Sequence, residues 1–176
     1  MQPTFAKASF SDADALEIAL NRRRETEVKQ VSLAPFDCQF LTLDYGQIHF
    51  SFVDIRTAMQ VVGTKGKACL EFSFLLEAAT QDLLSHGVPI STDMVFGFDP
   101  HREVNLVLPA HSQVCVVQID WETFNLCTEA LGRPDLNRDF LQANYVGIPH
   151  QVREVKGYLK NLYHLALRQP QLVTEA

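Results

Sequence analysis

The stretch that decides the fold is FDCQFLTLDYGQIHFSFVD, residues 36–54. Its first half alternates apolar and polar residues, apart from a slip near Leu41 that is consistent with a β-bulge. Residues 44–47, Asp-Tyr-Gly-Gln, are typical of a hairpin turn in which the glycine takes a positive φ. Residues 48–54 alternate again, with Ile48, Phe50 and Phe52 on one face. The pattern predicts two antiparallel strands joined by a tight turn.

Similar segments follow and precede this hairpin. We expect strands at residues 27–33, 69–76, 93–98, 104–108 and 114–119, with turns at 61–67 and 99–103. The segment 114–119 is apolar on nearly both faces, which predicts a central place in a sheet. Residues 77–90 fit a loop or a short helical turn that closes at His86-Gly87. Recurring short strands over residues 26–119 predict a mainly β fold, a cupin-like antiparallel barrel or sandwich.

Helices are predicted on either side of the strands. Ser11 is expected to cap a first helix, with Asp14 three residues further on, so residues 1–25 are assigned to an N-terminal helical segment. Asp120 is expected to cap a second helix that ends at Gly132. Residues 120–168 are therefore a helical segment, and the whole chain, 1–176, is predicted to form a single domain.

The last predicted helix lies between Pro149 and Pro170, and its apolar residues are spaced 3, 4, 3 and 4 apart. They are Val152, Val155, Leu159, Leu162 and Ala166. This is the heptad spacing of helices that pair, although a stretch this short is equally compatible with a helix packed on its own barrel. Tyr158, Tyr163 and Leu165 widen the apolar stripe, so it could serve both purposes. We expect a homodimer with these five residues at its interface.

The charge and the cysteines narrow the class of protein. A net charge of −6 gives no basic face, so no direct contact with nucleic acid is expected. The basic cluster at residues 22–24 is interpreted as a solvated helix end. No apolar run suits a signal peptide or a membrane span. Four cysteines lie among apolar neighbours, and we expect buried thiols in a cytoplasmic protein: Cys38, Cys69, Cys115 and Cys127.

The sequence contains no motif for nucleotide binding, serine hydrolysis or zinc proteolysis. Its six histidines form no H-x-H or i,i+4 pair, so we expect no metal, no cofactor, no catalytic residue and no enzyme activity. The apolar content permits a small cavity inside the barrel, with a filled core as the alternative. The aromatic residues predicted to line it are Phe40, Phe50, Phe72, Phe96 and Trp121. A cupin-fold enzyme and a ligand-free interaction module stay open as alternatives.

Four segments in a fixed order carry a family resemblance. Residues 9–16 contain F-x-D-x-D-x-L, residues 28–36 lead through Pro35, and residues 41–48 hold the hairpin. Residues 107–112, Val-Leu-Pro-Ala-His-Ser, come later. This order resembles the N-terminal region of bacterial AraC-type transcriptional regulators.

The resemblance implies a cupin-like barrel that binds a small-molecule effector, helices that dimerise, and a downstream pair of helix-turn-helix units. Only six residues follow Pro170, so the DNA-reading helices are not in this sequence. We therefore expect a non-catalytic effector-sensing and dimerisation domain, either a fragment of a longer regulator or a stand-alone relative. The family does not specify which residues hold the effector.

Overall fold

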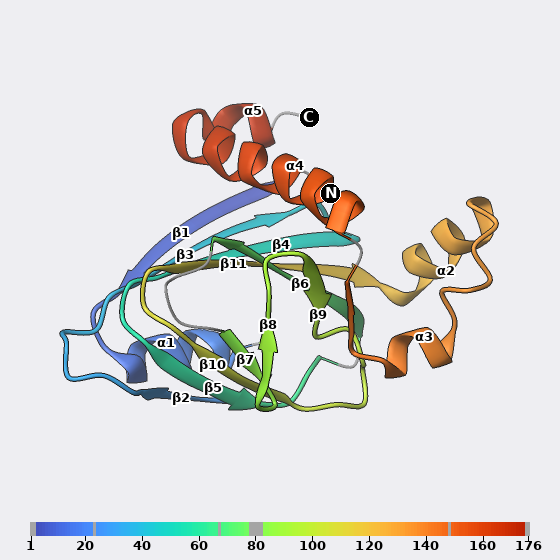
Figure 1. Ribbon diagram of the computed structural model, residues 1–176. Helices are drawn as coiled ribbons and strands as arrows, with labels where there is room; N and C mark the ends of the chain where they lie inside the picture. Colours follow the sequence, from blue (N-terminus) through green and yellow to red (C-terminus); the bar gives the residue numbers. More distant parts are fainter. Residues whose placement is uncertain (1–2, 23, 67, 78–82, 148, 175–176) are drawn as a thin grey trace.

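The computed structural model describes residues 3–22, 24–66, 68–77, 83–147 and 149–174. Two antiparallel sheets face each other, and the helices lie at the ends and across one outer face (Figure 1). In sheet order, the larger sheet contains β1 (Thr4–Phe10), β3 (Cys38–Asp44), β4 (Ile48–Ile55), β11 (Ser112–Asp120), β6 (Cys69–Glu77), β9 (Met94–Phe96) and β12 (Tyr145–Gly147). The smaller sheet contains β2 (Thr26–Gln30), β5 (Met59–Gly63), β10 (Val104–Leu108), β7 (Leu83–Ser85) and β8 (Val88–Ile90).

The helices are α1 (Ala13–Leu20), α2 (Trp121–Ala130), α3 (Arg138–Gln142), α4 (Pro149–Arg168) and α5 (Pro170–Thr174). The predicted class, mainly β with C-terminal helices, is confirmed. The strands form two separate sheets, so the molecule is a sandwich and not a closed barrel. The predicted central place of residues 114–119 is also confirmed, because β11 pairs with β4 on one side and β6 on the other.

The hairpin at residues 36–54 forms β3 and β4, and Gly46 takes the expected positive φ of 84°. The predicted bulge near Leu41 is wrong, since the register is unbroken from Cys38 opposite Ile55 to Asp44 opposite His49. Cys38 packs between the sheets, while Leu41 packs under α4 on the outer face. Because both faces of β3 are covered, apolar residues occur on both.

Three boundaries differ from the prediction. Residues 4–10 form the edge strand β1, so the first segment is not helix alone. The cap of α1 is Asp12 and not Ser11, since the Asp12 carboxylate accepts a hydrogen bond from the Ala15 amide at 2.7 Å. β12 lies within residues 120–168 and adds a strand to the larger sheet, because it pairs with β9.

Two predicted loops contain strands. The turn assigned to residues 61–67 begins within β5. The segment 83–90 is a hairpin of β7 and β8, whose two turn residues, His86 and Gly87, have φ of 53° and 77°. Positive φ at both positions is the geometry of a type I′ turn, which matches the twist of the strands. The rest of that predicted loop, residues 78–82, lies outside the described residues.

The core has two main layers. Between the sheets lies an apolar cluster that includes Leu16 of α1, Met59, Val61, Leu75 and Val114. On the outer face of the larger sheet, α4 and α5 cover a second cluster that includes Leu43, Phe52, Phe74 and Cys115 (Figure 1). α2 and α3 pack on a third cluster with Leu70 and Phe98.

The thiols are not all buried. Cys38 and Cys115 are buried, and burial raises the pKa of Cys38 to about 12, with Asp54 and Asp37 adding to the effect. Cys69 is half-buried, and Cys127 on α2 is exposed, so the prediction is wrong for Cys127. Only part of the apolar stripe of α2 is buried, and Phe124 is the residue of this helix that is buried.

Candidate polar site between the sheets

The larger sheet carries polar side chains on its inner face at one end of the sandwich. Along β6, Phe72 and Phe74 point outward, while Glu71 and Ser73 share the inner face with Leu75 of the core. Gln118 on β11 lies opposite Glu71 and also opposite His49 on β4, which in turn lies opposite Asp44 on β3. Directly paired residues point to the same face, so a polar row runs across four strands.

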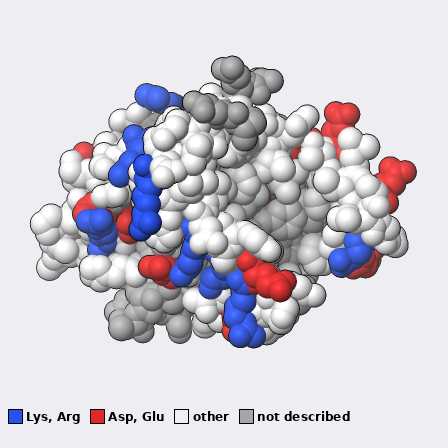
Figure 2. All heavy atoms as spheres, turned by 90° about the horizontal axis from the view of Figure 1, so that it is seen from above, with Lys and Arg blue, Asp and Glu red and all other residues white. Residues whose placement is uncertain are grey.

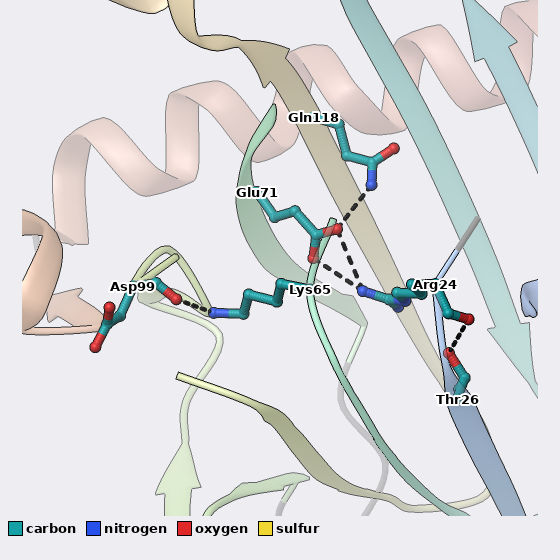
Figure 3. Close-up of polar contacts among 6 residues, drawn as sticks. All are labelled: Arg24, Thr26, Lys65, Glu71, Asp99 and Gln118. Carbon is teal, nitrogen blue, oxygen red and sulfur yellow. Dashed lines mark hydrogen bonds and ion pairs between the residues drawn. The ribbon is translucent and has the colours of Figure 1, made fainter. Parts of the chain in front are cut away.

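Arg24 joins this row from the connection between α1 and β2 (Figure 3). Its Nη1 donates to both carboxylate oxygens of Glu71, at 2.9 and 3.2 Å, and Gln118 Nε2 donates to Glu71 Oε1 at 2.7 Å. The Glu71 side chain is 4% exposed and that of Arg24 is 18% exposed. Removal of the guanidinium would leave the buried Glu71 carboxylate without this ion pair, which costs several kcal/mol, on the order of 3–5.

Lys65 reaches the same region from the connection between β5 and β6, and its Nζ donates to the backbone oxygen of Asp99 at 2.6 Å (Figure 3). The pKa of Lys65 is lowered to about 8, mainly by burial and to a smaller extent by Arg24 and Arg102, while Glu71 and Asp99 oppose this shift. The Asp99 carboxylate points away from Lys65 and accepts from the His101 amide.

The Asp99 segment is held in place by Asn144. The Asn144 side-chain oxygen accepts from the Asp99 amide at 3.0 Å, and its backbone oxygen accepts from Gly97 at 2.8 Å. Asn144 is 2% exposed and has φ of 61°, a conformation that asparagine tolerates better than most residues. This buried side chain therefore fixes the carbonyl that Lys65 contacts.

These groups surround a cavity of about 30 Å³ between the sheets. Its described lining includes Arg24, Lys65, Glu71, Ser73, Ser85 and Phe96. That volume is close to the share of one water molecule in the liquid. The side chains themselves, above all that of Arg24, therefore fill most of this end of the sandwich.

A shallow depression of about 390 Å³ lies next to the cavity, and Glu103 lines both. Glu25 and Glu27 complete its acidic side chains. Among the described residues that line the depression, none is a lysine or an arginine. Glu27 is paired with Lys29 at 2.9 Å, so the acidic excess of this lining rests on Glu25 and Glu103.

The five aromatic residues predicted to line a pocket do not come together. Phe96 lines the cavity, whereas Phe40 packs against the core between the sheets. Phe50 and Phe72 lie on the outer face, because they occupy the opposite phase of the strand alternation. Trp121 lines a separate groove of about 260 Å³ beside α2 and α3.

The polar residues of the site were not predicted. Arg24 was interpreted as part of a solvated helix end, and the structure corrects this, because its guanidinium is buried against Glu71. The sequence around Glu71, Leu-Glu-Phe-Ser-Phe at residues 70–74, alternates as in a strand with one exposed face, so it carries no signal of a buried charge.

The predicted pairing stripe of α4 lies mostly against the chain's own sheet. Val152, Leu159 and Ala166 are 3%, 5% and 0% exposed within the outer-face cluster, and Leu162 packs against it. Val155 is the member that is clearly exposed, at 39%. The alternative in which the helix packs on its own sheet therefore describes four of the five residues, and the interface stays a prediction.

In the described part of the chain, no group of three or more His, Cys, Asp or Glu side chains is arranged to hold a metal ion. No helix within the described ranges is long and apolar enough to cross a membrane.

The two-sheet sandwich with C-terminal helices and a polar inner end defines the structural class of this chain. No protein-family model matches the sequence, and no curated protein matches it. A solved structure of similar fold is the AraC-like transcriptional activator CuxR, with a TM-score of 0.58 and 8% sequence identity. The similarity covers 96% of this chain and 66% of the CuxR chain, so the present chain spans just under two thirds of that protein. At this identity the likeness shows a shared fold.

Proposed function

We propose that this chain is the effector-sensing and dimerisation domain of an AraC-type transcriptional regulator. The observation that carries the proposal is the likeness of fold to an AraC-like activator along 96% of the chain. The order of sequence motifs in residues 9–48 and 107–112 supports the same family independently of the fold. In this proposal the chain reads no DNA itself, in keeping with its net charge of −6.

The effector site is the cavity around Glu71, and not a pocket of aromatic side chains. Glu71, Gln118 and Ser73 are polar groups placed between two sheets where apolar packing would be expected for stability alone. A ligand-binding site typically combines a few polar groups of this kind with apolar side chains around them. Phe96 and Val104 are apolar side chains in the lining of this cavity.

A ligand screen by thermal shift tests the sensing function. We expect that a small polar metabolite raises the Tm of the wild-type chain, because a ligand that binds only the folded state stabilises it. The same ligand should have no effect on a Ser73→Phe variant, in which the ring fills the cavity. If no small molecule raises the Tm of the wild type, the chain is better described as an interaction module.

The dimerisation surface is a second stripe of α4, which lies beside the buried one. Val155, Tyr158, Leu162 and Leu165 are spaced 3, 4 and 3 apart, again a heptad spacing. Tyr158 is 75% exposed and Leu165 is 38% exposed. Figure 2 looks down on the α4 side, where charged side chains form small groups of mixed sign and leave wide uncharged areas. The wide stripe thus serves the chain's own sheet with one edge and a second copy with the other.

Light scattering coupled to size exclusion tests the dimer. We expect the wild type to be dimeric at protein concentrations well above a micromolar dissociation constant of the dimer. The Tyr158→Asp and Leu165→Asp variants should be monomeric at the same concentrations. Leu33→Asp is the matched control and should remain dimeric, because Leu33 is a fully exposed leucine in the β2–β3 connection and not on α4. A monomeric wild type, or dimers that survive both helix substitutions, would contradict this interface.

A further inference from the structure

Glu71 cannot leave the interior of the sandwich. It lies within β6, which is paired to β11 on one side and to β9 on the other. Its carboxylate is 4% exposed and lies beside Gln118 on the neighbouring strand. A buried carboxylate needs charged or strongly donating partners, so whatever occupies this end of the sandwich must supply them.

Arg24 supplies them now, and its side chain can move. Its residue lies in the connection between α1 and β2, outside both elements. The backbone there is anchored, because Thr26 Oγ1 donates to the Arg24 carbonyl oxygen and the Arg24 amide donates to Leu20. Rotation about the long arginine side chain alone can therefore withdraw the guanidinium.

A ligand needs the space that Arg24 fills. The cavity of about 30 Å³ holds no more than about one water molecule. Lys65 also lines it, but its ammonium is already bonded to the Asp99 carbonyl oxygen, on the side away from Arg24 (Figure 3). A ligand that displaces Arg24 thus faces the fixed pair of Glu71 and Gln118.

The charge of the approach favours the same kind of ligand. Glu25 and Glu103 line the depression next to the cavity, together with Glu27, whose carboxylate is paired with Lys29. A negative entrance concentrates cations and repels anions. The fixed buried carboxylate is thus the main feature that favours a cation, and Glu25 and Glu103 at the depression act in the same direction.

We propose that the effector is a cation, a small molecule with a guanidinium, amidinium or ammonium group that binds Glu71 and Gln118 in place of the Arg24 guanidinium. Arg24 is then a built-in competitor, which keeps the site closed until the effector is present. This inference rests on the proposed effector-sensing function and names the chemical class of ligand for that site.

Chemical rescue of Arg24→Ala tests the proposal. The variant should have a lower Tm than the wild type, and millimolar methylguanidinium should raise that Tm by about 2–4 °C. Methylguanidinium should have no such effect on Arg24→Ala/Glu71→Gln, which lacks the carboxylate. Arg133→Ala is the matched control, since Arg133 also forms an ion pair, with Asp135, but on the surface. It should show no rescue.

An equal Tm rise in Arg24→Ala and in the double variant, or rescue by acetate in place of methylguanidinium, overturns the inference. If Arg24→Ala does not fold, Arg24→Lys keeps a cation, and calorimetric titration with agmatine should show tighter binding to it than to the wild type. Equal or weaker binding to Arg24→Lys overturns the competitor role.

The proposed function can fail separately. If a neutral polyol or a carboxylic acid raises the Tm of the wild type and amines do not, the effector site stands and its preference for cations is overturned. If methylguanidinium rescues Arg24→Ala but no small molecule of any charge raises the Tm of the wild type, the site accepts cations, and effector sensing by the native chain is overturned.

Discussion

Gly63 lies where β5 runs beside the start of β2. It pairs with Thr26, and the Thr64 amide donates to the Glu25 backbone oxygen at 2.8 Å. A Cβ atom at position 63 would overlap that same oxygen. The close approach of the two backbones therefore requires glycine here, and it also sets the position of the Arg24 residue just before.

We expect Gly63→Ala to destabilise the chain by about 1–3 kcal/mol, because the β2 backbone must move away. Gly157 in α4 is the control, since nothing lies within 4 Å of a Cβ atom built there. Gly157→Ala should stabilise by about 0.5–1 kcal/mol through helix propensity. Urea denaturation measures both, and equal effects of the two substitutions would contradict the steric argument.

Lys65 gives the stability of the chain a pH dependence. Burial lowers its pKa in the folded state from 10.5 to about 8. Between these values the unfolded chain binds more protons than the folded one, so the free energy of unfolding rises with pH. The penalty for the buried charge is present in full below pH 8 and is relieved above it.

Lys65→Met removes this charge while keeping the length of the side chain. The free energy of unfolding of Lys65→Met minus that of the wild type should therefore be larger at pH 7 than at pH 9.5. Taking this difference cancels the titration of the groups that the two proteins share. Urea denaturation of both at each pH measures it. A difference that stays constant between pH 7 and pH 9.5 would falsify the assignment of the lowered pKa to Lys65.

At the scale of elements, α4 carries two adjoining apolar stripes with different tasks. Leu159 is 5% exposed under the helix, whereas Leu165 is 38% exposed on the neighbouring edge. The Lys156 ammonium further fixes the helix by donating to the Thr92 backbone oxygen at 2.8 Å. This contact joins α4 to the connection before β9, the strand whose Phe96 lines the cavity.

Alanine substitutions separate the two stripes. Leu159→Ala should reduce the free energy of unfolding by about 2–5 kcal/mol, because it opens a cavity in the outer-face cluster. Leu165→Ala should change the stability of the monomer by no more than about 0.5 kcal/mol, since it removes a half-exposed side chain. Chemical denaturation at a protein concentration that keeps the chain monomeric makes the comparison; equal losses would show that the burial pattern is different in solution.

At the scale of the whole molecule, both terminal regions pack on the larger sheet. β1 forms its edge, and α5 contacts β1 while α4 crosses the outer face (Figure 1). The α4–α5 layer covers apolar side chains such as Leu43, Phe52 and Phe74. The helices are therefore part of the fold and are not an appendage used only for pairing.

Removal of residues 149–176 should expose that face. A contiguous apolar surface of this kind promotes aggregation, so we expect the shortened chain to be largely insoluble. Sedimentation of the expressed protein and its near-ultraviolet circular dichroism provide the measurement. A soluble shortened chain with native dichroism would mean that the outer-face cluster contributes little to folding.

The sequence by itself determined the local elements. The hairpin of β3 and β4, the capped α2 and the α4 helix that begins at Pro149 follow from alternation, turn residues and caps, which act over a few neighbours. The central place of β11 also followed, because a strand that is apolar on both faces must be covered on both. These signals are local, so they do not depend on the rest of the fold.

Only the tertiary structure decided which groups meet. A periodic stripe shows that α4 has an apolar face, but not that Leu159 lies on the larger sheet while Tyr158 is exposed. Arg24 and Glu71 lie 47 residues apart, and their ion pair depends on β6 and the α1–β2 connection meeting at one end of the sandwich. Long-range pairing of this kind is set by the packing of all the elements together, since no local pattern encodes the partner of a buried charge.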